Sequence, residues 1–463
     1  MRTDAANNAE RVLQSTITLL RTEPEASLEE IAAAAGVSRA TVYRRFGSRA
    51  ELVDTARRRA AESADANQTD ALRPPGELAG GPTPLDVTEV LNKVPPHLLG
   101  DQIVSEAQRL AGVTSVALYL IDLEGTHLLR LAGSEEFPET LGLPLAVGPE
   151  LPREGLLALR RRIADELPGS VLAPLSLRGR TLGILLAVDA PEHALVALAR
   201  QAAASLALAD DYTDVFDIAR RRKETSPAAE VQQNLLPPRI ARITGALVVG
   251  NVLPGYEIGG DWFDYVENRD GAWLGVADSM GSGTTAAALG AVALGAFRAK
   301  RKVTGDLEAA VLAIHETIRE VAIEGAFVNA TIARWHAPSS AFTWITCGEQ
   351  RPLLITERGE LRAMESETYE SLGLGPAKRS FAVSRRRLAP GERLLLVSDG
   401  VLDRRTRDGG TFGTDGVRAA IRGVADAAPA ETVRALEDAI TAASADRLED
   451  DATIVVLAPT SRR

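Results

Sequence analysis

The stretch Leu274-Gly-Val-Ala-Asp278-Ser-Met-Gly-Ser-Gly283 places an aspartate at the end of a short apolar run, directly before a glycine-rich turn. Three further aspartates in the last half of the chain border similar runs. They lie in Gly259-Gly-Asp261-Trp-Phe-Asp264, Leu394-Leu-Leu-Val-Ser-Asp399-Gly-Val401 and Glu449-Asp450-Asp451-Ala-Thr-Ile-Val-Val-Leu457. Hydrophobic strands that deliver carboxylates to a common edge can form an oxygen-only site for hard divalent cations. The four aspartates therefore predict a cation site.

The expected strand order supports this convergence. Residues 246–253 and 272–278 read as strands, and a hairpin through Asn268-Arg-Asp-Gly271 would bring Asp261 close to Asp278. A single aspartate before glycine is more often a turn or a strand-end cap, but four in one cleft would repel each other without cations. Because no histidine or cysteine accompanies them, Mg²⁺ or Mn²⁺ is favoured over Zn²⁺. Two such ions can hold a phosphate and activate a water.

The bulk composition describes a globular protein of about three domains, since 463 residues at roughly 150 per domain suggest that number. A net charge of −11 argues against a nucleic-acid coat protein, although arginines gather in the first sixty residues. The single cysteine, Cys347, excludes an internal disulfide and favours a reducing, cytoplasmic setting. We expect no membrane span, because no apolar run reaches about 18 residues.

Changes in composition along the chain predict the domain boundaries. Residues 61–84 are rich in proline, glycine and small polar residues and read as a flexible linker. We expect a domain over 1–60, a second over 85–220 and a third over 225–463. A long helical pattern over 194–236, which Pro227 is expected to kink or restart, is predicted to join the last two.

The first domain has the pattern of a helix-turn-helix. Ser27 and Glu30 form an N-terminal capping box, Gly36 marks a turn, and Ser38 is placed to cap a second helix. Ala32 and Val42 are expected to pack the two helices together. The segment from Ser27 to Val53 resembles the DNA-binding domain of TetR-type repressors, with Ala5 to Leu20 as its first helix. The expected DNA-contacting residues are Ser38, Arg39, Thr41, Tyr43, Arg44 and Arg45. The alternative is a module that docks a protein or dimerises.

The middle segment alternates strand patterns with helices at both ends, which indicates an α+β sandwich. In this order of elements it resembles a GAF domain. The resemblance implies either a site for an unidentified small molecule or a domain that only dimerises and transmits a signal.

The last domain resembles the bacterial, SpoIIE-like branch of the type 2C metal-dependent Ser/Thr protein phosphatases. The resemblance rests on Val231-Gln-Gln-Asn-Leu-Leu-Pro-Pro238 and on the four aspartate stretches. It implies two antiparallel sheets flanked by helices and two cations, Mn²⁺ or Mg²⁺. It also implies that Asp278 bridges both cations, that Asp261 holds the second, and that Asp399 and Asp450 hold the first. The carbonyl of Ser279 would complete a shell, with Asp264, Asp451, Gly281 and Gly283 in support.

The resemblance further implies attack of a metal-bridging water on phosphoserine or phosphothreonine, on a substrate such as a phosphorylated anti-anti-sigma factor. Ser282 and Glu349 depart from the family, which usually has histidine in each of those motifs. The leading interpretation is a dimeric phosphatase gated by the GAF-like domain and coupled to DNA binding. The alternative is a DNA-binding transcriptional regulator whose phosphatase domain is weak or inactive and serves as a sensor or scaffold.

Overall fold

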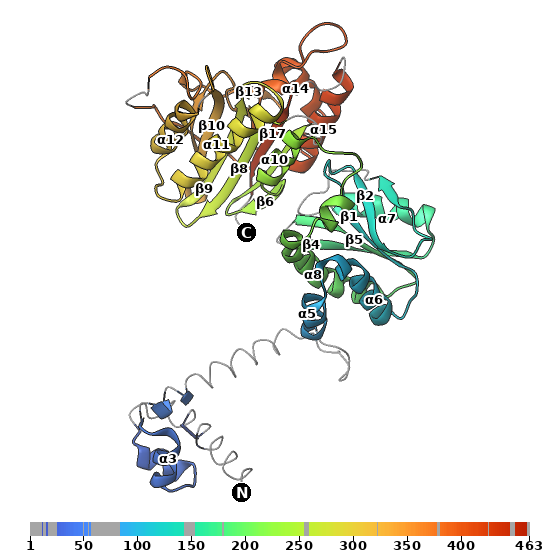
Figure 1. Cartoon of the computed structure of the whole chain (residues 1–463), viewed down its shortest axis with the longest axis vertical. Helices are drawn as coiled ribbons and strands as arrows, with labels where there is room; N and C mark the ends of the chain where they lie inside the picture. Colours follow the sequence, from blue (N-terminus) through green and yellow to red (C-terminus); the bar gives the residue numbers. More distant parts are fainter. Residues whose placement is uncertain are drawn as a thin grey trace. The chain divides into compact units, whose positions relative to one another are not determined.

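The computed structural model forms two compact units, residues 1–81 and 82–463 (Figure 1). The residues it describes are 12, 15–16, 26–49, 51–53, 55–56, 84–142, 153–177, 180–253, 259–321, 323–376, 380–424, 426–444 and 450–460. The expected linker, apart from its last residue, and most of the expected first helix lie outside this description. Among the described helices, none combines the length and apolar character that a membrane crossing requires.

The first unit contains the expected pair of helices, α2 (Leu28–Ala34) and α3 (Arg39–Phe46). Both hydrogen bonds of the predicted capping box at Ser27 are present, and the Ser38 hydroxyl accepts a hydrogen bond from the Thr41 amide at 3.2 Å. Ala32 and Val42 are buried in one small core, as predicted. The helix-turn-helix is therefore confirmed.

The middle part of the second unit is an antiparallel sheet with helices on both faces. Its strands follow the order β3-β2-β1-β5-β4. Their bounds are β1 Val116–Ile121, β2 His127–Gly133, β3 Thr140–Gly142, β4 Ser170–Leu177 and β5 Arg180–Val188, and the helices are α5 Pro84–Lys93, α6 Leu99–Ala111, α7 Arg153–Glu166 and α8 Glu192–Ala209. Alternate residues of β1 face opposite sides. Leu118 packs in the core with α6 and α8, while Tyr119 packs in the core with α7.

The predicted helical stretch over 194–236 is not continuous, although a helix does begin again at Pro227 as expected. The chain leaves α8 through a 3₁₀ turn at Asp210–Tyr212, then forms α9 (Val215–Ala219) and, further on, α10 (Pro227–Leu235). The break arises because Phe216 turns back and is fully buried in the core of the middle part. An ion pair of 2.8 Å between Arg220 and Asp210 closes this fold-back. Two short helices therefore replace the part of the expected helix that follows α8.

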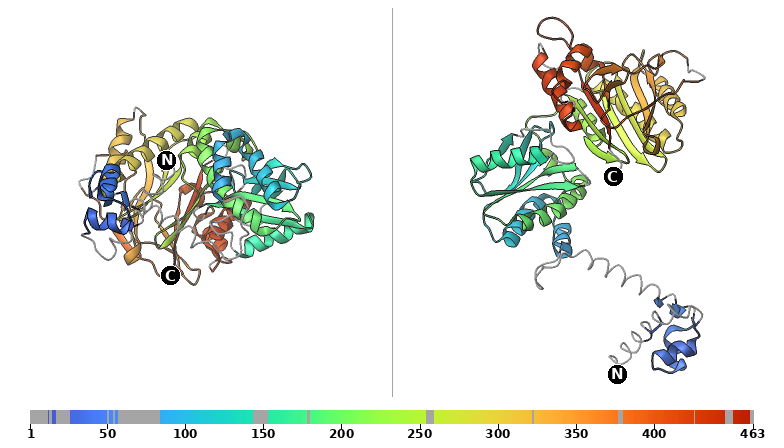
Figure 2. Two further views of the ribbon diagram at one scale, coloured as in Figure 1. Left: turned by 90° about the horizontal axis from the view of Figure 1, so that it is seen from below. Right: turned by 180° about the vertical axis from the view of Figure 1, so that it is seen from behind.

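The last part is the expected two-sheet sandwich flanked by helices (Figures 1 and 2). One sheet has the order β14-β11-β10-β9-β8, with β15 beside β11, and the other has the order β13-β12-β16-β17-β7-β6. The strands are β6 Ile240–Ile243, β7 Ala246–Leu253, β8 Trp262–Asn268, β9 Gly271–Ser279, β10 Val328–His336, β11 Ala341–Cys347, β12 Leu353–Ile355, β13 Leu361–Ala363, β14 Thr368–Tyr369, β15 Ser384–Arg387, β16 Arg393–Val397 and β17 Ala452–Pro459.

Helices cover the outer faces of both sheets. α11 (Gly283–Arg301) and α12 (Leu307–Glu320) pack on the first sheet, and α14 (Gly413–Ile421) and α15 (Pro429–Ala443) on the second. The inner faces of the sheets share a core that includes Phe263, Trp335 and Leu396. The predicted hairpin is confirmed, since β8 and β9 are antiparallel and Asn268 pairs with Gly271.

Candidate active site

Four strands bring aspartates to one end of the sandwich. Asp261 directly precedes β8, and Asp278 is the penultimate residue of the neighbouring β9. In the other sheet, Asp399 follows β16 and begins the short helix α13 (Asp399–Leu402), while Asp450 and Asp451 precede β17. Because β16 and β17 are antiparallel neighbours, the end of one strand lies beside the start of the other.

Side-chain contacts, one backbone hydrogen bond and charge link these residues to each other. The side chain of Asp278 is in hydrogen-bonding contact with those of Asp261 and Asp399. Asp451 joins through its Oδ2 atom, which accepts a hydrogen bond from the Asp261 amide at 3.1 Å. Asp450 is exposed; its charge acts on Asp278, and the charge of Asp399 acts on Asp450. We call these five residues the aspartate cluster.

A glycine makes the close approach of the two loops possible. A Cβ atom on Gly400 would lie 1.7 Å from the carbonyl oxygen of Asp451, so no other residue fits there without moving the backbone. The Asp399-Gly400 pair is therefore required by packing as well as by chemistry.

Burial and mutual repulsion make the cluster reluctant to ionise. Burial, followed by the charge of Asp278, raises the pKa of Asp399 to about 7. Burial likewise raises the pKa of Asp451 to about 7 and raises the pKa values of Asp261 and Asp278. A cation placed among these groups would reverse the effect, because an opposite charge favours the ionised form.

The donor set fits a hard divalent cation. Three buried side-chain oxygens, Gln232 Oε1, Ser279 Oγ and Asp451 Oδ1, have no hydrogen-bond partner among the described residues. Oxygen atoms of this kind, together with carboxylates, are what Mg²⁺ and Mn²⁺ prefer. Within the described ranges, no group of three or more acidic, histidine or cysteine side chains is already closed into a metal cage. The carboxylates instead meet in pairs, which a cation would have to draw together.

Several polar residues that the sequence reasoning missed hold the aspartate cluster in place. Gln232 of α10 donates to Asp451 Oδ2 at 2.6 Å and to the Asp261 carbonyl at 2.9 Å. Thr453 donates to Asp261 at 2.5 Å, and Asn329 to Asp278 at 3.3 Å. Gln232 lies in the quoted lead-in, and Thr453 follows Asp451 by two residues, so only their positions along the chain hinted at these contacts.

Arg404 connects the loop that contains Asp399 and Gly400 to the loop that contains Asp450. Its guanidinium group donates to the carbonyl oxygens of Gly400, at 3.1 Å, and Asp450, at 2.7 Å. The Arg404 side chain therefore holds the backbone at Asp450 and next to Asp399 in place.

Asp264 does not join the aspartate cluster. Its carboxylate lies 2.8 Å from both Arg298 and Arg301 of α11, in a buried ion-pair network. Arg298 also donates to the carbonyl of Leu235 at the end of α10, at 2.7 Å. Asp264 on β8 is therefore connected to α11 by these ion pairs and, through Arg298, to α10.

Ser282 and Glu349, the two positions that depart from the expected motifs, lie near the aspartate cluster. Gly281 and Gly283 both have positive φ, and Ser282 precedes α11 without a side-chain capping bond. Gly348, just before Glu349, adjoins Asn329, because an added Cβ would lie 2.5 Å from Asn329 Oδ1.

The predicted DNA-contacting residues share α3 and its cap. The hydroxyl groups of Ser38 and Thr41 lie 2.8 Å apart, so Ser38 is engaged in capping. The Tyr43 side chain is 62% exposed. The side chains of Arg39, Arg44 and Arg45 lie outside the described part of the chain.

The raised pKa values of Asp399 and Asp451, about 7 against an ordinary 3.8, predict a pH effect on stability. Without cations, both groups stabilise the fold below about pH 4, and this contribution is lost as the pH rises towards about 7. We expect the melting temperature in EDTA to fall between about pH 5 and pH 8. Added Mn²⁺ should raise it more at the higher pH. If Mn²⁺ raised the melting temperature by the same amount at about pH 5 and at about pH 8, the cations would not be acting through the ionisation of these aspartates.

Comparison with known proteins gives two family matches. Residues 268–459 match the model of Stage II sporulation protein E (SpoIIE), and residues 24–56 match bacterial regulatory proteins of the tetR family. Among solved structures, the SiaA-PP2C domain of Pseudomonas aeruginosa is 18% identical, with 50% of this chain and 94% of that chain covered and a TM-score of 0.43. The RsbU and RsbW domains of Rv1364c from Mycobacterium tuberculosis are 25% identical, with coverages of 47% and 62% and a TM-score of 0.41.

Proposed function

Because this chain joins a TetR-type helix-turn-helix domain to a SpoIIE-type protein serine/threonine phosphatase domain, we propose that it releases phosphate from a phosphorylated regulatory protein under the control of its middle domain. The observation that supports this most is the aspartate cluster, with its raised pKa values and unpartnered oxygens. The substrate we propose is an anti-anti-sigma factor or similar regulator, phosphorylated on serine or threonine.

Different residues of the aspartate cluster have different roles in cation binding. In this proposal Asp278 would help to hold both of two cations, Asp261 would help to hold one of them, and Asp399 with Asp450 would help to hold the other. Bound Mg²⁺ or Mn²⁺ would supply charge to the phosphoryl oxygens and a water of lowered pKa. Thr453 and Asn329 fix the carboxylate orientations of Asp261 and Asp278 through the hydrogen bonds described above.

The decisive assay measures phosphate release by the full chain from a phosphoserine peptide, with Mn²⁺ and with EDTA. Turnover that requires Mn²⁺ supports the proposal. Protein that binds Mn²⁺ but releases no phosphate would favour the alternative, a DNA-binding regulator with an inactive phosphatase fold, which the serine at position 282 motivates.

A chain of ion pairs supports control by the middle domain. Arg222 pairs with Asp122 of the β1–β2 turn at 2.7 Å. The adjacent Arg221 lies 2.6 Å from Glu230 of α10 and also pairs with Asp217 of α9. These contacts join the middle domain to α10, the helix whose Gln232 holds Asp451. A shift of the middle domain would thus reach the aspartate cluster through α10.

Gln232→Ala is expected to lower the rate of phosphate release by about tenfold or more, because Asp451 and the Asp261 carbonyl each lose a buried donor. The fold should persist, as judged by circular dichroism. The control is Asn234→Ala on the same helix, where the exposed side chain donates to Glu230 and not to the aspartate cluster. Equal rates for wild type and Gln232→Ala would contradict a role for α10.

For the first domain we propose DNA binding, as a dimer. The double variant Arg44→Ala, Arg45→Ala should weaken binding and reduce the slope of log affinity against log salt by up to about 2, since each phosphate contact contributes roughly 0.9. Fluorescence anisotropy on duplex DNA at several salt concentrations measures both quantities. If the wild-type protein shows no salt-sensitive binding, the domain is a protein-docking module instead.

A further inference from the structure

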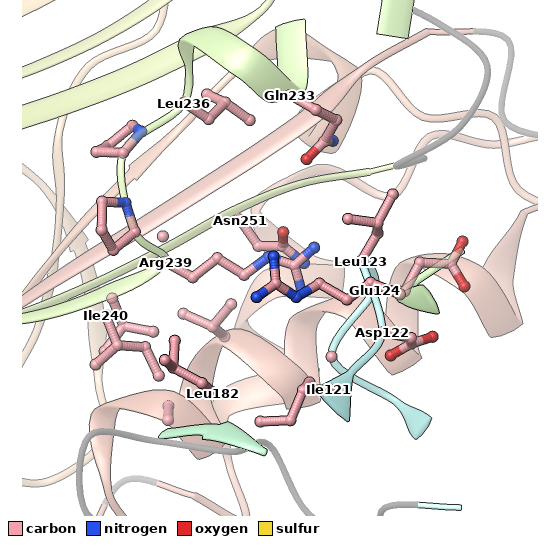
Figure 3. Close-up of a pocket in the computed structure, with 18 of the residues that line it drawn as sticks. Ile121, Asp122, Leu123, Glu124, Leu182, Gln233, Leu236, Arg239, Ile240 and Asn251 are labelled. Atoms are coloured by element: carbon pink, nitrogen blue, oxygen red, sulfur yellow. The ribbon is translucent and has the colours of Figure 1, made fainter. Parts of the chain in front are cut away.

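Two segments outside the named strands are connected to the aspartate cluster. The first is α10, whose Gln232 holds Asp451 and whose next residue, Gln233, lines a cavity of about 350 Å³ that α10 shares with the middle domain (Figure 3). The second is the loop Ser371-Leu-Gly-Leu-Gly375, which follows β14 and contacts Asn329. We call it the Ser371 loop. It lies within the phosphatase domain and meets β10 and α12, so its role is separate from that of the middle domain.

The Ser371 loop pairs with the start of β10 as a further strand would. Leu372 and Val328 exchange two backbone hydrogen bonds of 2.9 Å, in the antiparallel sense. This register sets Ser371 opposite Asn329, and Asn329 in turn lies opposite Asp278 of β9. Side chains at facing positions of neighbouring strands lie on the same face of a sheet. Ser371, Asn329 and Asp278 therefore form one row.

Hydrogen bonds run along this row in one direction. The Ser371 hydroxyl donates to Asn329 Oδ1 at 2.7 Å, and Asn329 Nδ2 donates to Asp278 Oδ2 at 3.3 Å. An ionised carboxylate can only accept, so the NH₂ end of the amide has to face Asp278. The amide oxygen then faces Ser371, whose hydroxyl is its donor. Without this hydroxyl, nothing in the row would keep the Asn329 amide in this orientation.

The Ser371 loop is itself fixed by α12. Leu372 is 1% exposed and packs in the same core as Ile318. The Gly373 amide donates to Nδ1 of His315, also on α12, at 3.2 Å. A Cβ atom on Gly373, whose φ is +98°, would lie 2.5 Å from Ile318 Cγ2, so the loop approaches the helix as closely as glycine permits. The position of Ser371 is therefore set by the packing of the domain.

We propose that Ser371 is a positioning residue for the cation site. Its hydroxyl keeps the NH₂ group of Asn329 turned toward Asp278, and this donor holds the ionised carboxylate in one orientation. Ser371 acts through Asn329 and not by contact with a cation. Its effect on phosphate release rests on the proposed function, whereas its effect on cation binding is measured without substrate.

The test measures the dissociation constant of Mn²⁺ for the full chain by isothermal titration calorimetry. Removal of an outer hydrogen-bond partner of a metal ligand costs about 10–100-fold in affinity. We expect Ser371→Ala to weaken Mn²⁺ binding about tenfold, at the lower end of this range, because one side chain intervenes. Ser371→Thr, which keeps the hydroxyl, should remain within about twofold of wild type.

Ser339→Ala is the matched control. The Ser339 hydroxyl also makes a side-chain hydrogen bond of 2.7 Å, with Nδ1 of His336 at the other end of β10. The same chemical change is thus made on the same strand, away from the aspartate cluster. This variant should bind Mn²⁺ as wild type does.

A double variant separates action through Asn329 from a direct effect of Ser371. Asn329→Ala should weaken Mn²⁺ binding at least as much as Ser371→Ala. Adding Ser371→Ala to Asn329→Ala should cause no further loss, because the amide that Ser371 orients is already gone. Losses that add in the double variant would overturn the proposal.

The proposal also fails if Ser371→Ala binds Mn²⁺ as tightly as wild type, if alanine and threonine weaken binding equally, or if wild type binds no Mn²⁺. Phosphate release is measured separately, with 4-nitrophenyl phosphate over a range of Mn²⁺ concentrations. Ser371→Ala should need about tenfold more Mn²⁺ for its half-maximal rate. If wild type binds Mn²⁺ but hydrolyses no ester, the proposed function fails, while the calorimetry still decides the role of Ser371.

Discussion

Asp278→Asn is expected to reduce Mn²⁺-dependent phosphate release at least about a hundredfold. The Asp278 carboxylate contacts that of Asp261, next to the first sheet, and that of Asp399, next to the second sheet, and so lies between the two. Asparagine keeps the size but removes the charge that a cation requires. A loss of a few kcal/mol of charge stabilisation in the transition state corresponds to two or three factors of ten in rate.

Stability separates this effect from misfolding. Without cations the Asp278→Asn protein should melt at the same or a higher temperature than wild type, because one repulsive carboxyl group has gone. With saturating Mn²⁺ it should gain less stability than wild type. Asp415→Asn, an exposed carboxylate in the first turn of α14, is the control for the same chemical change. Full activity of Asp278→Asn would refute the assignment of the cluster.

The strand ends were predictable from sequence because two short-range signals coincide there. An apolar run followed by aspartate and glycine, as at Asp399-Gly400, specifies a buried strand and the turn that ends it. The hairpin between β8 and β9 follows from Asn268 to Gly271, a local turn. Convergence of four such ends then follows from antiparallel pairing, so the fold class and the general place of the cluster were accessible.

Contacts between distant segments were not predictable in this way. Gln232 meets Asp451 across 219 positions of sequence, and no periodicity marks that glutamine as different from Gln233. The interruption of the helix between α8 and α10 could not be predicted for a related reason. The residues over 194–236 have helical composition throughout, but burial of Phe216 in the middle core is a tertiary gain that overrides local propensity.

Asp264 lies three residues after Asp261, and the resemblance implied only a supporting role for it. Side chains alternate between the two faces of an extended strand, so this odd spacing places Asp264 on the face opposite to that of Asp261. There it meets Arg298 and Arg301, two residues whose role depends on the packing of α11 against the sheet.

Asp264→Asn is therefore expected to act on stability more than on cation binding. The Asp264 side chain is 2% exposed and that of Arg301 is 8% exposed, so removing the charge leaves a guanidinium group buried without its counter-ion. Loss of one partner from such a pair costs about 3–5 kcal/mol in the free energy of unfolding. For a domain of this size that corresponds to roughly a 10 °C fall in melting temperature.

Asp270→Asn provides the matched control, because Asp270 pairs with Arg334 at 2.6 Å but its side chain is 57% exposed. An exposed ion pair contributes about 0–1 kcal/mol, so this variant should melt within a few degrees of wild type. The Mn²⁺ concentration for half-maximal phosphate release should be the same for Asp264→Asn and wild type below the melting transition. If Asp264→Asn instead keeps its stability and needs much more Mn²⁺, then Asp264 serves the cation site, and the buried ion pairs with α11 are secondary to that role.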